Sequence, residues 1–114
     1  MAALILTASG NVTNAGTATL TTGALPGNTG DVTLQYILTK VSGTVAGTAK
    51  PQGSLDGTNW LDIPSQSAFT NTDVATQSTI WYLRNTKCLY YRILVTGSGT
   101  MVATPTGFYV EDKS

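Results

Sequence analysis

Short alternating segments separated by turn residues run along most of this chain, and they constrain its fold more than any other feature. No stretch of twelve or more residues has helical spacing free of Gly, Pro or Thr clusters. Threonine makes up about a fifth of the 114 residues. Its β-branched side chain suits a pleated, half-exposed strand better than a helix. The pattern therefore predicts an all-β protein.

The spacing of the segments predicts one domain over residues 1–114. Turn residues recur every 8–12 residues and give about eight short strands, which is typical of a single antiparallel β-sandwich of jelly-roll or immunoglobulin-like kind. Periodicity does not encode strand order, so both topologies stay open. Within the domain, we expect 1–30 to hold possible N-terminal attachment strands and 111–114 to form a short solvated tail. The clearest apolar faces consist of Ala18 and Leu20 in one strand and of Val32, Leu34, Tyr36 and Leu38 in the next.

Proline and glycine positions predict further details. Pro51 interrupts the strand at 44–55, so we expect that strand to be an edge or to carry a bulge. Asp56-Gly57 is a hairpin signal that leads into the strand at 60–63, with Trp60 as a large anchor. Later strands are expected at 78–83 and 88–96, joined by a turn at 84–87. Two more are expected at 100–103 and 108–110.

Charge excludes several classes of partner. Six Lys and Arg residues balance six Asp and Glu residues, for a net charge of zero. Six scattered cations form no basic patch for nucleic acid, and a basic amphipathic membrane helix is absent. The segment 1–9 lacks the basic region of a signal peptide, so we expect a first strand there and a cytosolic origin. A near-neutral surface does not repel its own copies, which favours a homo-oligomer.

The residues needed for catalysis are scarce. The chain has no histidine, which removes Ser-His-Asp and Cys-His arrangements and most zinc sites. Cys88 stands alone in an apolar run and is expected to behave as a small hydrophobe. Asp56 and Asp62 could approach each other across the hairpin, but each is more simply a turn former or a solvated side chain. We therefore expect no enzyme, no catalytic residue, no cofactor and no metal.

Aromatic side chains allow two interpretations. Trp60, Trp81, Tyr82 and Tyr109 could form a platform for sugar rings, but aromatics in short strands usually fill the core or a subunit interface. Tyr90 and Arg92 lie opposite the apolar face of their strand, and both residue types are enriched at interface hot spots. The predicted interface candidates are Tyr90, Arg92, Trp81 and Tyr109, and the predicted turn and anchor residues are Asp56, Gly57 and Trp60.

Two motifs carry a family resemblance. The segment Gly53-Ser-Leu-Asp-Gly-Thr-Asn-Trp60, with Tyr90-Tyr-Arg-Ile-Leu-Val-Thr-Gly-Ser-Gly-Thr-Met101, resembles small β-sandwich structural proteins of tailed bacteriophages. In those proteins a "GS-x-DG-x-NW" hairpin and a "YYR-x-x-VTG-x-GT" strand pair recur. The resemblance covers about residues 44–110 and implies a virion component assembled in the host cytoplasm.

The resemblance implies a structural role in the virion. The main candidate is a capsid decoration protein that binds the major capsid protein as a homo-oligomer, with a trimer preferred over a dimer. A head-fibre or tail accessory subunit that binds other virion subunits is an alternative. Separately from the resemblance, a carbohydrate-binding module or adhesin-like domain that binds a host glycan through exposed aromatics is another alternative, and a similar hairpin occurs in discoidin-like and other carbohydrate-binding sandwiches.

Overall fold

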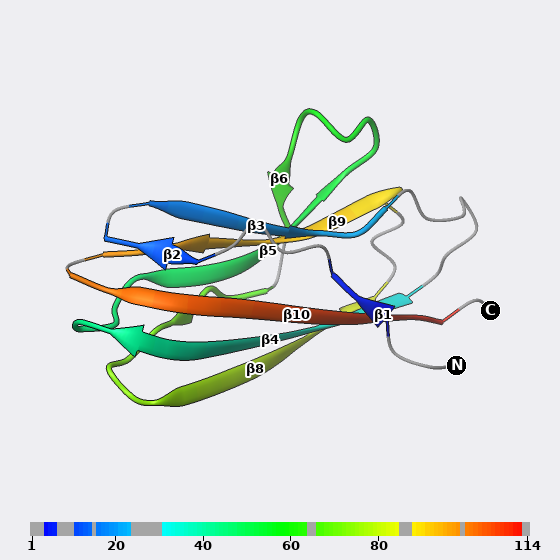
Figure 1. The fold of residues 1–114 in the computed structure, drawn as a ribbon. Helices are drawn as coiled ribbons and strands as arrows, with labels where there is room; N and C mark the ends of the chain where they lie inside the picture. Colours follow the sequence, from blue (N-terminus) through cyan, green and yellow to red (C-terminus); the bar gives the residue numbers. More distant parts are fainter. Residues whose placement is uncertain are drawn as a thin grey trace.

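The computed structural model describes residues 4–6, 11–14, 16–23, 31–63, 66–84, 88–98 and 100–112 (Figure 1). These residues form ten β-strands, and no helix among them is long and apolar enough to cross a membrane. The strands are β1 (Leu4–Ile5), β2 (Val12–Thr13), β3 (Thr17–Thr21), β4 (Asp31–Ser42), β5 (Thr48–Ser54), β6 (Leu61–Asp62), β7 (Phe69–Thr70), β8 (Thr76–Arg84), β9 (Tyr90–Thr96) and β10 (Val102–Asp112).

The strands form two antiparallel sheets of five strands each. Sheet A has the order β1-β10-β4-β8, and β2 also pairs with β10. Sheet B has the order β3-β9-β5-β6, and β7 also pairs with β5. The predicted all-β sandwich is confirmed.

The pairings are nested along the chain, and this decides the topology. β1 and β2 pair with β10, β3 with β9, β4 with β8, and β5 with β6 and β7. One long antiparallel hairpin is thus wrapped around the core, which is the jelly-roll arrangement and not the immunoglobulin one. β8 and β9 lie in different sheets, so they are not the hairpin that their sequence spacing suggested. The intervening residues 85–87 lie outside the described part.

Prolines stand inside two central strands. Pro51 of β5 pairs with Ile93 of β9, and Pro105 of β10 pairs with Leu38 of β4, with no bulge at either position. The predicted edge strand or bulge at Pro51 is therefore wrong. The Pro51 carbonyl accepts a hydrogen bond from the Ile63 amide, so the proline nitrogen also faces that side, away from β9.

Both prolines are tolerated inside a strand because the neighbouring strand is interrupted on the side that each proline nitrogen faces. The side of β5 that Pro51 faces is occupied by β6 and then β7, and the proline lies between the residues that they pair. On β10, Pro105 lies in the same way between the residues paired with β2 and those paired with β1. Since no strand offers a backbone acceptor at either point, the missing N–H of proline removes no hydrogen bond from the sheet. The segments expected as two strands at 100–103 and 108–110 consequently form one strand, which also takes in part of the expected tail.

The core lies between the two sheets and follows the predicted alternation. The predicted inward residues of 17–22 and 31–41 are all at most 3% exposed. Two buried tyrosines carry polar groups into this core. The Tyr36 hydroxyl donates to Asn71 Oδ1 at 3.0 Å, and the Tyr91 hydroxyl accepts from the Cys88 amide at 3.0 Å. Within the described residues, each buried side-chain nitrogen or oxygen has a hydrogen-bond partner.

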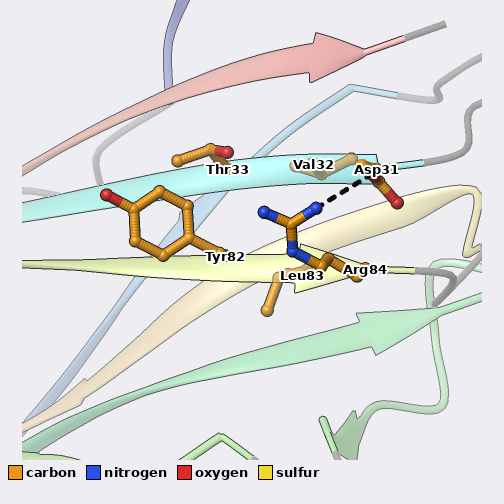
Figure 2. A pocket seen from close by; sticks show the side chains of 6 residues that line it. All are labelled: Asp31, Val32, Thr33, Tyr82, Leu83 and Arg84. Atoms are coloured by element: carbon orange, nitrogen blue, oxygen red, sulfur yellow. Dashed lines mark ion pairs between the residues drawn. The ribbon is translucent and has the colours of Figure 1, made fainter.

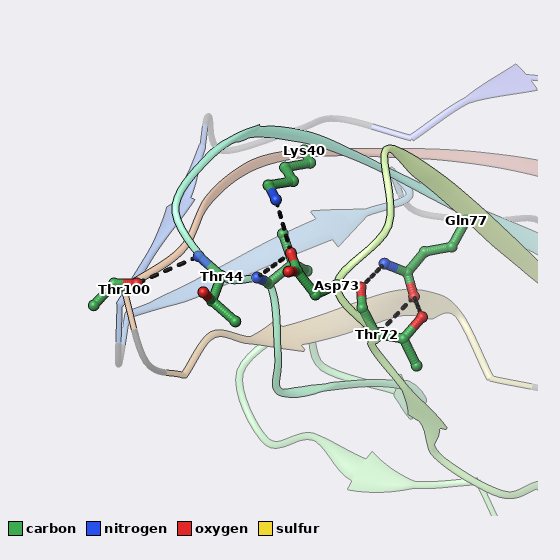
Figure 3. Close-up of polar contacts among 7 residues, drawn as sticks. Lys40, Thr44, Thr72, Asp73, Gln77 and Thr100 are labelled. Atoms are coloured by element: carbon green, nitrogen blue, oxygen red, sulfur yellow. Dashed lines mark hydrogen bonds and ion pairs between the residues drawn. The ribbon is translucent and has the colours of Figure 1, made fainter.

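Polar contacts hold the connections at one end of the sandwich (Figure 3). Asp73 Oδ1 accepts from Lys40 Nζ at 2.9 Å and from the Val45 amide at 3.1 Å. Close by, the Gln77 amide group bonds with both the backbone N–H and the carbonyl of Thr72. These contacts tie the segment between β7 and β8 to β4 and to the segment that precedes β5.

Candidate functional site

A loop at 55–60 joins β5 to β6 and projects from the body of the sandwich (Figure 1). Asp56 organises it, because its Oδ1 accepts from the backbone amides of Thr58 and Asn59, each at 2.9 Å. Asp56 Oδ2 accepts from Asn59 Nδ2 at 2.8 Å, and the Ser54 hydroxyl donates to Oδ1. These bonds, the Asn59 amide first, hold the pKa of Asp56 well below its usual range. The hairpin prediction is confirmed, although the loop is longer than a two-residue turn.

At its base the loop contacts β9 of sheet B, where Gly57 and Trp60 lie against Tyr90 and Arg92. Gly57 has a φ of +75°, and a Cβ at this position would stand 3.3 Å from the Tyr90 ring. The Trp60 and Tyr90 rings meet edge to face, with their centroids 6.4 Å apart. Arg92 Cζ lies 4.4 Å from the Trp60 centroid. Trp60, Tyr90 and Arg92 are each partly exposed, so the cluster is open to a ligand.

Arg92 also begins a chain of hydrogen bonds across the strands. Arg92 Nε donates to Gln52 Oε1 at 2.7 Å, and Gln52 Nε2 donates to Asp62 Oδ1 at 2.8 Å. Lys50 Nζ lies 3.2 Å from Asp62 Oδ1. The hydrogen bond from Gln52, followed by that from Lys50, lowers the pKa of Asp62. The planar ends of Arg92, Gln52 and Asp62 are thus fixed relative to one another.

Hydroxyl groups cover most of the remaining outer face of sheet B. Thr17, Thr96, Thr48 and Thr70 stand in register across β3, β9, β5 and β7. Thr21 is in register with Arg92 in the row described above. We name the row Arg92, Gln52 and Asp62, together with Trp60 and Tyr90, the sheet B site.

The other predicted aromatic residues lie elsewhere. Trp81 is 5% exposed, packs 6.2 Å from the Tyr36 ring, and donates from Nε1 to the Ser67 carbonyl. Its prediction as an interface residue is therefore wrong. Tyr82 is 58% exposed on the outer face of sheet A, and Tyr109 packs against the core. Trp60, Trp81, Tyr82 and Tyr109 consequently do not form a common platform.

The sequence predicted Trp60 as an anchor and Tyr90 and Arg92 as contact residues, and the structure places the three together. Their predicted role as contact residues stays a prediction for Tyr90 and Arg92. Gln52 and Asp62 were missed as site residues. Gln52 lies two residues from Lys50, so alternation could have placed both side chains on the outer face of their strand. No local sequence pattern, however, pairs Gln52 with Arg92.

Three of the described carboxylates, Asp56, Asp62 and Asp73, have the pKa direction of charged side chains and not of proton donors. Hydrogen bonds lower the pKa of Asp56 and Asp62, and the contact with Lys40 does the same for Asp73. A glycosidase needs one carboxyl group whose pKa is raised. In the described parts of the chain, no three His, Cys, Asp or Glu residues come together as a metal site. Burial raises the pKa of the Cys88 thiol, which packs against the core.

An open depression of about 110 Å³ lies at one end of sheet A, between β4 and β8 (Figure 2). It is lined by Asp31, Val32, Thr33, Tyr82, Leu83 and Arg84. Arg84 Nη1 lies 3.9 Å from Asp31 Oδ2, and its side chain is 76% exposed. The depression lacks the aromatic cluster and the fixed hydrogen-bond row that distinguish the sheet B site.

Comparison with known proteins extends the fold assignment. No family model and no curated protein matches the chain. Among solved structures, the enzymatically active domain of tailspike protein 4 from bacteriophage CBA120 is similar, with a TM-score of 0.58 at 10% identity. A family GH115 4-O-methyl-alpha-glucuronidase, BtGH115A, with specificity for decorated arabinogalactans, has a TM-score of 0.52 at 12% identity.

Both likenesses cover 90% of this chain but only 15% and 14% of the two larger proteins, respectively. At these identities they establish a shared fold and nothing more. A carbohydrate-binding module, CBM28, specific for non-crystalline cellulose, scores 0.47 over 86% of this chain and 65% of its own, which is too low to carry an argument.

Proposed function

We propose that this protein is a non-catalytic glycan-binding module and that the sheet B site binds the glycan. The observation that carries the proposal is the row Arg92, Gln52 and Asp62 beside the Trp60 ring. A sugar ring has an apolar C–H face and a rim of hydroxyl groups. Trp60 and Tyr90 supply apolar surface with a polar tip. The accessible ends of the row, Arg92 and Asp62, supply donors and acceptors, while the buried Gln52 holds them apart.

Preorganisation supports the same proposal. Arg92, Gln52 and Asp62 already hold one another in place, so a ligand does not have to order them. The face next to them carries threonine hydroxyls and has little net charge, which suits a neutral polyhydroxyl chain. β9 has seven residues, and at roughly 3.4 Å per residue the face is about 20 Å long, enough for several sugar units.

A polysaccharide screen by affinity electrophoresis tests the proposal. Decorated arabinogalactan and non-crystalline cellulose belong in the screen, alongside bacterial surface polysaccharides. We expect at least one to retard the protein, and Trp60→Ala and Asp62→Ala to weaken that binding at least about tenfold. Val74→Ala, at an exposed apolar residue of the segment between β7 and β8, is the matched control and should bind as the wild type does. Retardation by no polysaccharide, or loss of binding in Val74→Ala alone, would contradict the proposal.

A virion structural role is the second candidate. The specific observation in its favour is the set of exposed apolar side chains on sheet A, which includes Ile80 and Tyr82. This role includes capsid decoration, head-fibre and tail accessory functions, with virion subunits as partners. Quantitative protein analysis of purified particles tests it, since a structural subunit should be present in many copies per particle. Absence of the protein from particles would reject this candidate and leave the glycan proposal intact.

A further inference from the structure

The outer face of sheet A carries a group of apolar side chains in three neighbouring rows. Pairing places Ile5, Phe108, Gln35 and Ile80 in one row across β1, β10, β4 and β8. The adjacent rows add Val110 and Tyr82 on one side and Ile37 on the other. We name Ile5, Ile37, Ile80, Tyr82, Phe108 and Val110 the sheet A patch.

The patch is accessible to solvent. Ile5 is 72% exposed, Tyr82 is 58% exposed and Ile80 is 44% exposed. Single exposed apolar residues are ordinary on protein surfaces, but several in neighbouring rows mark an interaction site. The large strands β10, β4 and β8 run side by side here (Figure 1), so the patch spans a broad sheet face and not an isolated edge.

Charge on this face is confined to its margin. Asp31 and Arg84 pair with each other at one end, where Asp112 of β10 is also in register with Asp31. The outward positions between that pair and Thr39 carry hydroxyl, amide or apolar groups in the described strands. Away from that end, a second copy of the same face therefore meets uncharged side chains, and the chain as a whole has a net charge of zero.

We propose that the sheet A patch packs against the same patch of a second copy, in a two-fold dimer. The strands β1, β10, β4 and β8 have 2, 11, 12 and 9 residues, so at about 3.4 Å per residue and about 4.8 Å between strands they give a face of roughly 550 Å² in projection. The smallest stable interfaces bury about 600 Å² per partner, so the face is close to the size that a small dimer interface needs. One uncharged surface facing itself suits an isologous contact, in which each copy uses the same residues.

The arrangement leaves the sheet B site free. Sheets A of the two copies would lie face to face, with both B faces on the outside. The dimer would then present two glycan sites to one polymer, and the second binding event would become intramolecular. Dimerisation itself does not depend on glycan binding.

Sedimentation equilibrium over the micromolar range tests the dimer. We expect the wild-type protein to be a dimer, and Ile80→Lys and Tyr82→Lys to raise the dissociation constant at least about a hundredfold. Both positions are exposed, so circular dichroism should show an unchanged fold. Leu55→Lys and Leu61→Lys are matched controls, because these apolar residues are 66% and 76% exposed near the projecting loop. Both should dimerise like the wild type.

Several outcomes would overturn the proposal. A wild-type monomer over the whole range would do so, and so would a trimer, which has no two-fold contact. Equal dimerisation by Ile80→Lys and the wild type would place the contact elsewhere, as would loss of the dimer in Leu61→Lys. The glycan screen gives an independent result, because Ile80→Lys should retain glycan binding by its monomer.

Discussion

The guanidinium group of Arg92 lies over the Trp60 ring, with Cζ 4.4 Å from the ring centroid. The same side chain donates to Gln52, so one residue links the projecting loop to the polar row on β5 and β6. An arginine over an aromatic face is favourable through the charge of the guanidinium and the ring quadrupole. The contact fixes the position of the ring relative to the hydrogen-bonding groups that we assign to the glycan.

Arg92→Lys tests this link. Lysine keeps the charge but lacks the planar group that stacks on Trp60 and bonds to Gln52. We expect the Trp60 fluorescence to shift to longer wavelength and glycan affinity to fall about tenfold. Since the oxygen of the buried Gln52 loses its donor, the unfolding free energy should fall by about 1–3 kcal/mol. The spectrum of Trp60→Phe supplies the Trp81 background. An unchanged Trp60 emission would show that the stacking does not persist in solution.

Asp56→Ala should loosen the projecting loop. The alanine side chain cannot accept from the Thr58 and Asn59 amides, so their hydrogen exchange should become at least about tenfold faster. Asp56→Asn is the control, because its side-chain carbonyl can still accept both bonds. Exchange measured by NMR separates the two variants. Equal protection in Asp56→Ala and the wild type would mean that other contacts hold the loop.

Tyr36→Phe should destabilise the fold. The Tyr36 hydroxyl donates to Asn71 Oδ1, and Asn71 is only 4% exposed. Without that donor, a buried acceptor is unsatisfied, at a cost of about 1–3 kcal/mol. Urea unfolding measures this cost. Tyr82→Phe, at an exposed position, should change stability by less than about 0.5 kcal/mol, and an equal effect of both substitutions would refute the explanation.

The prolines give a comparison within one strand. Thr106→Pro should cost about 1–3 kcal/mol, because Thr106 pairs with Ile37 and its N–H faces β4. Pro105→Ala should change stability by less than about 1 kcal/mol, because its nitrogen faces the interval between β1 and β2. Urea unfolding measures the free energy of unfolding of both variants. A larger loss for Pro105→Ala than for Thr106→Pro would contradict the assigned directions.

The prolines also show what the sequence could predict and what it could not. Alternation identified the inward residues of β3 and β4, because burial between two sheets requires a period of two. It misassigned Pro51 to an edge, since the rule against proline assumes a continuous neighbour on each side. Only the pairing of β5 with two separate short strands, β6 and β7, removes that conflict.

The sheet B site likewise has some features that the sequence predicted and others that it did not. Trp60 and the Asp56-Gly57 turn were visible because turn chemistry is local. The contact between Arg92 and Gln52 joins residues forty positions apart and depends on the registry of β9 with β5. Trp81 was misjudged because alternation defines two faces of a strand but not which face meets the core.

Acid should weaken the fold through three carboxylates. The pKa values of Asp56, Asp62 and Asp73 are lower in the folded protein than the ordinary value. Their stabilising effect is complete above the unfolded pKa of about 3.9 and is lost as the pH falls through the folded values. We expect the urea midpoint to decrease below about pH 4. In Asp73→Asn the decrease should be shallower, and a midpoint that rises on acidification would contradict the assigned pKa directions.

The most direct test of the glycan-binding proposal is an NMR titration of the wild-type protein. The ligand is an oligosaccharide from the polysaccharide that binds best in the screen, and amide and indole shifts are followed. We predict the largest changes at residues 50–62 and 90–94 and at the Trp60 indole, with the Trp81 indole and β8 unchanged. Shifts confined to β4 and β8, or no saturable shifts with any oligosaccharide, would contradict the assignment of glycan binding to sheet B.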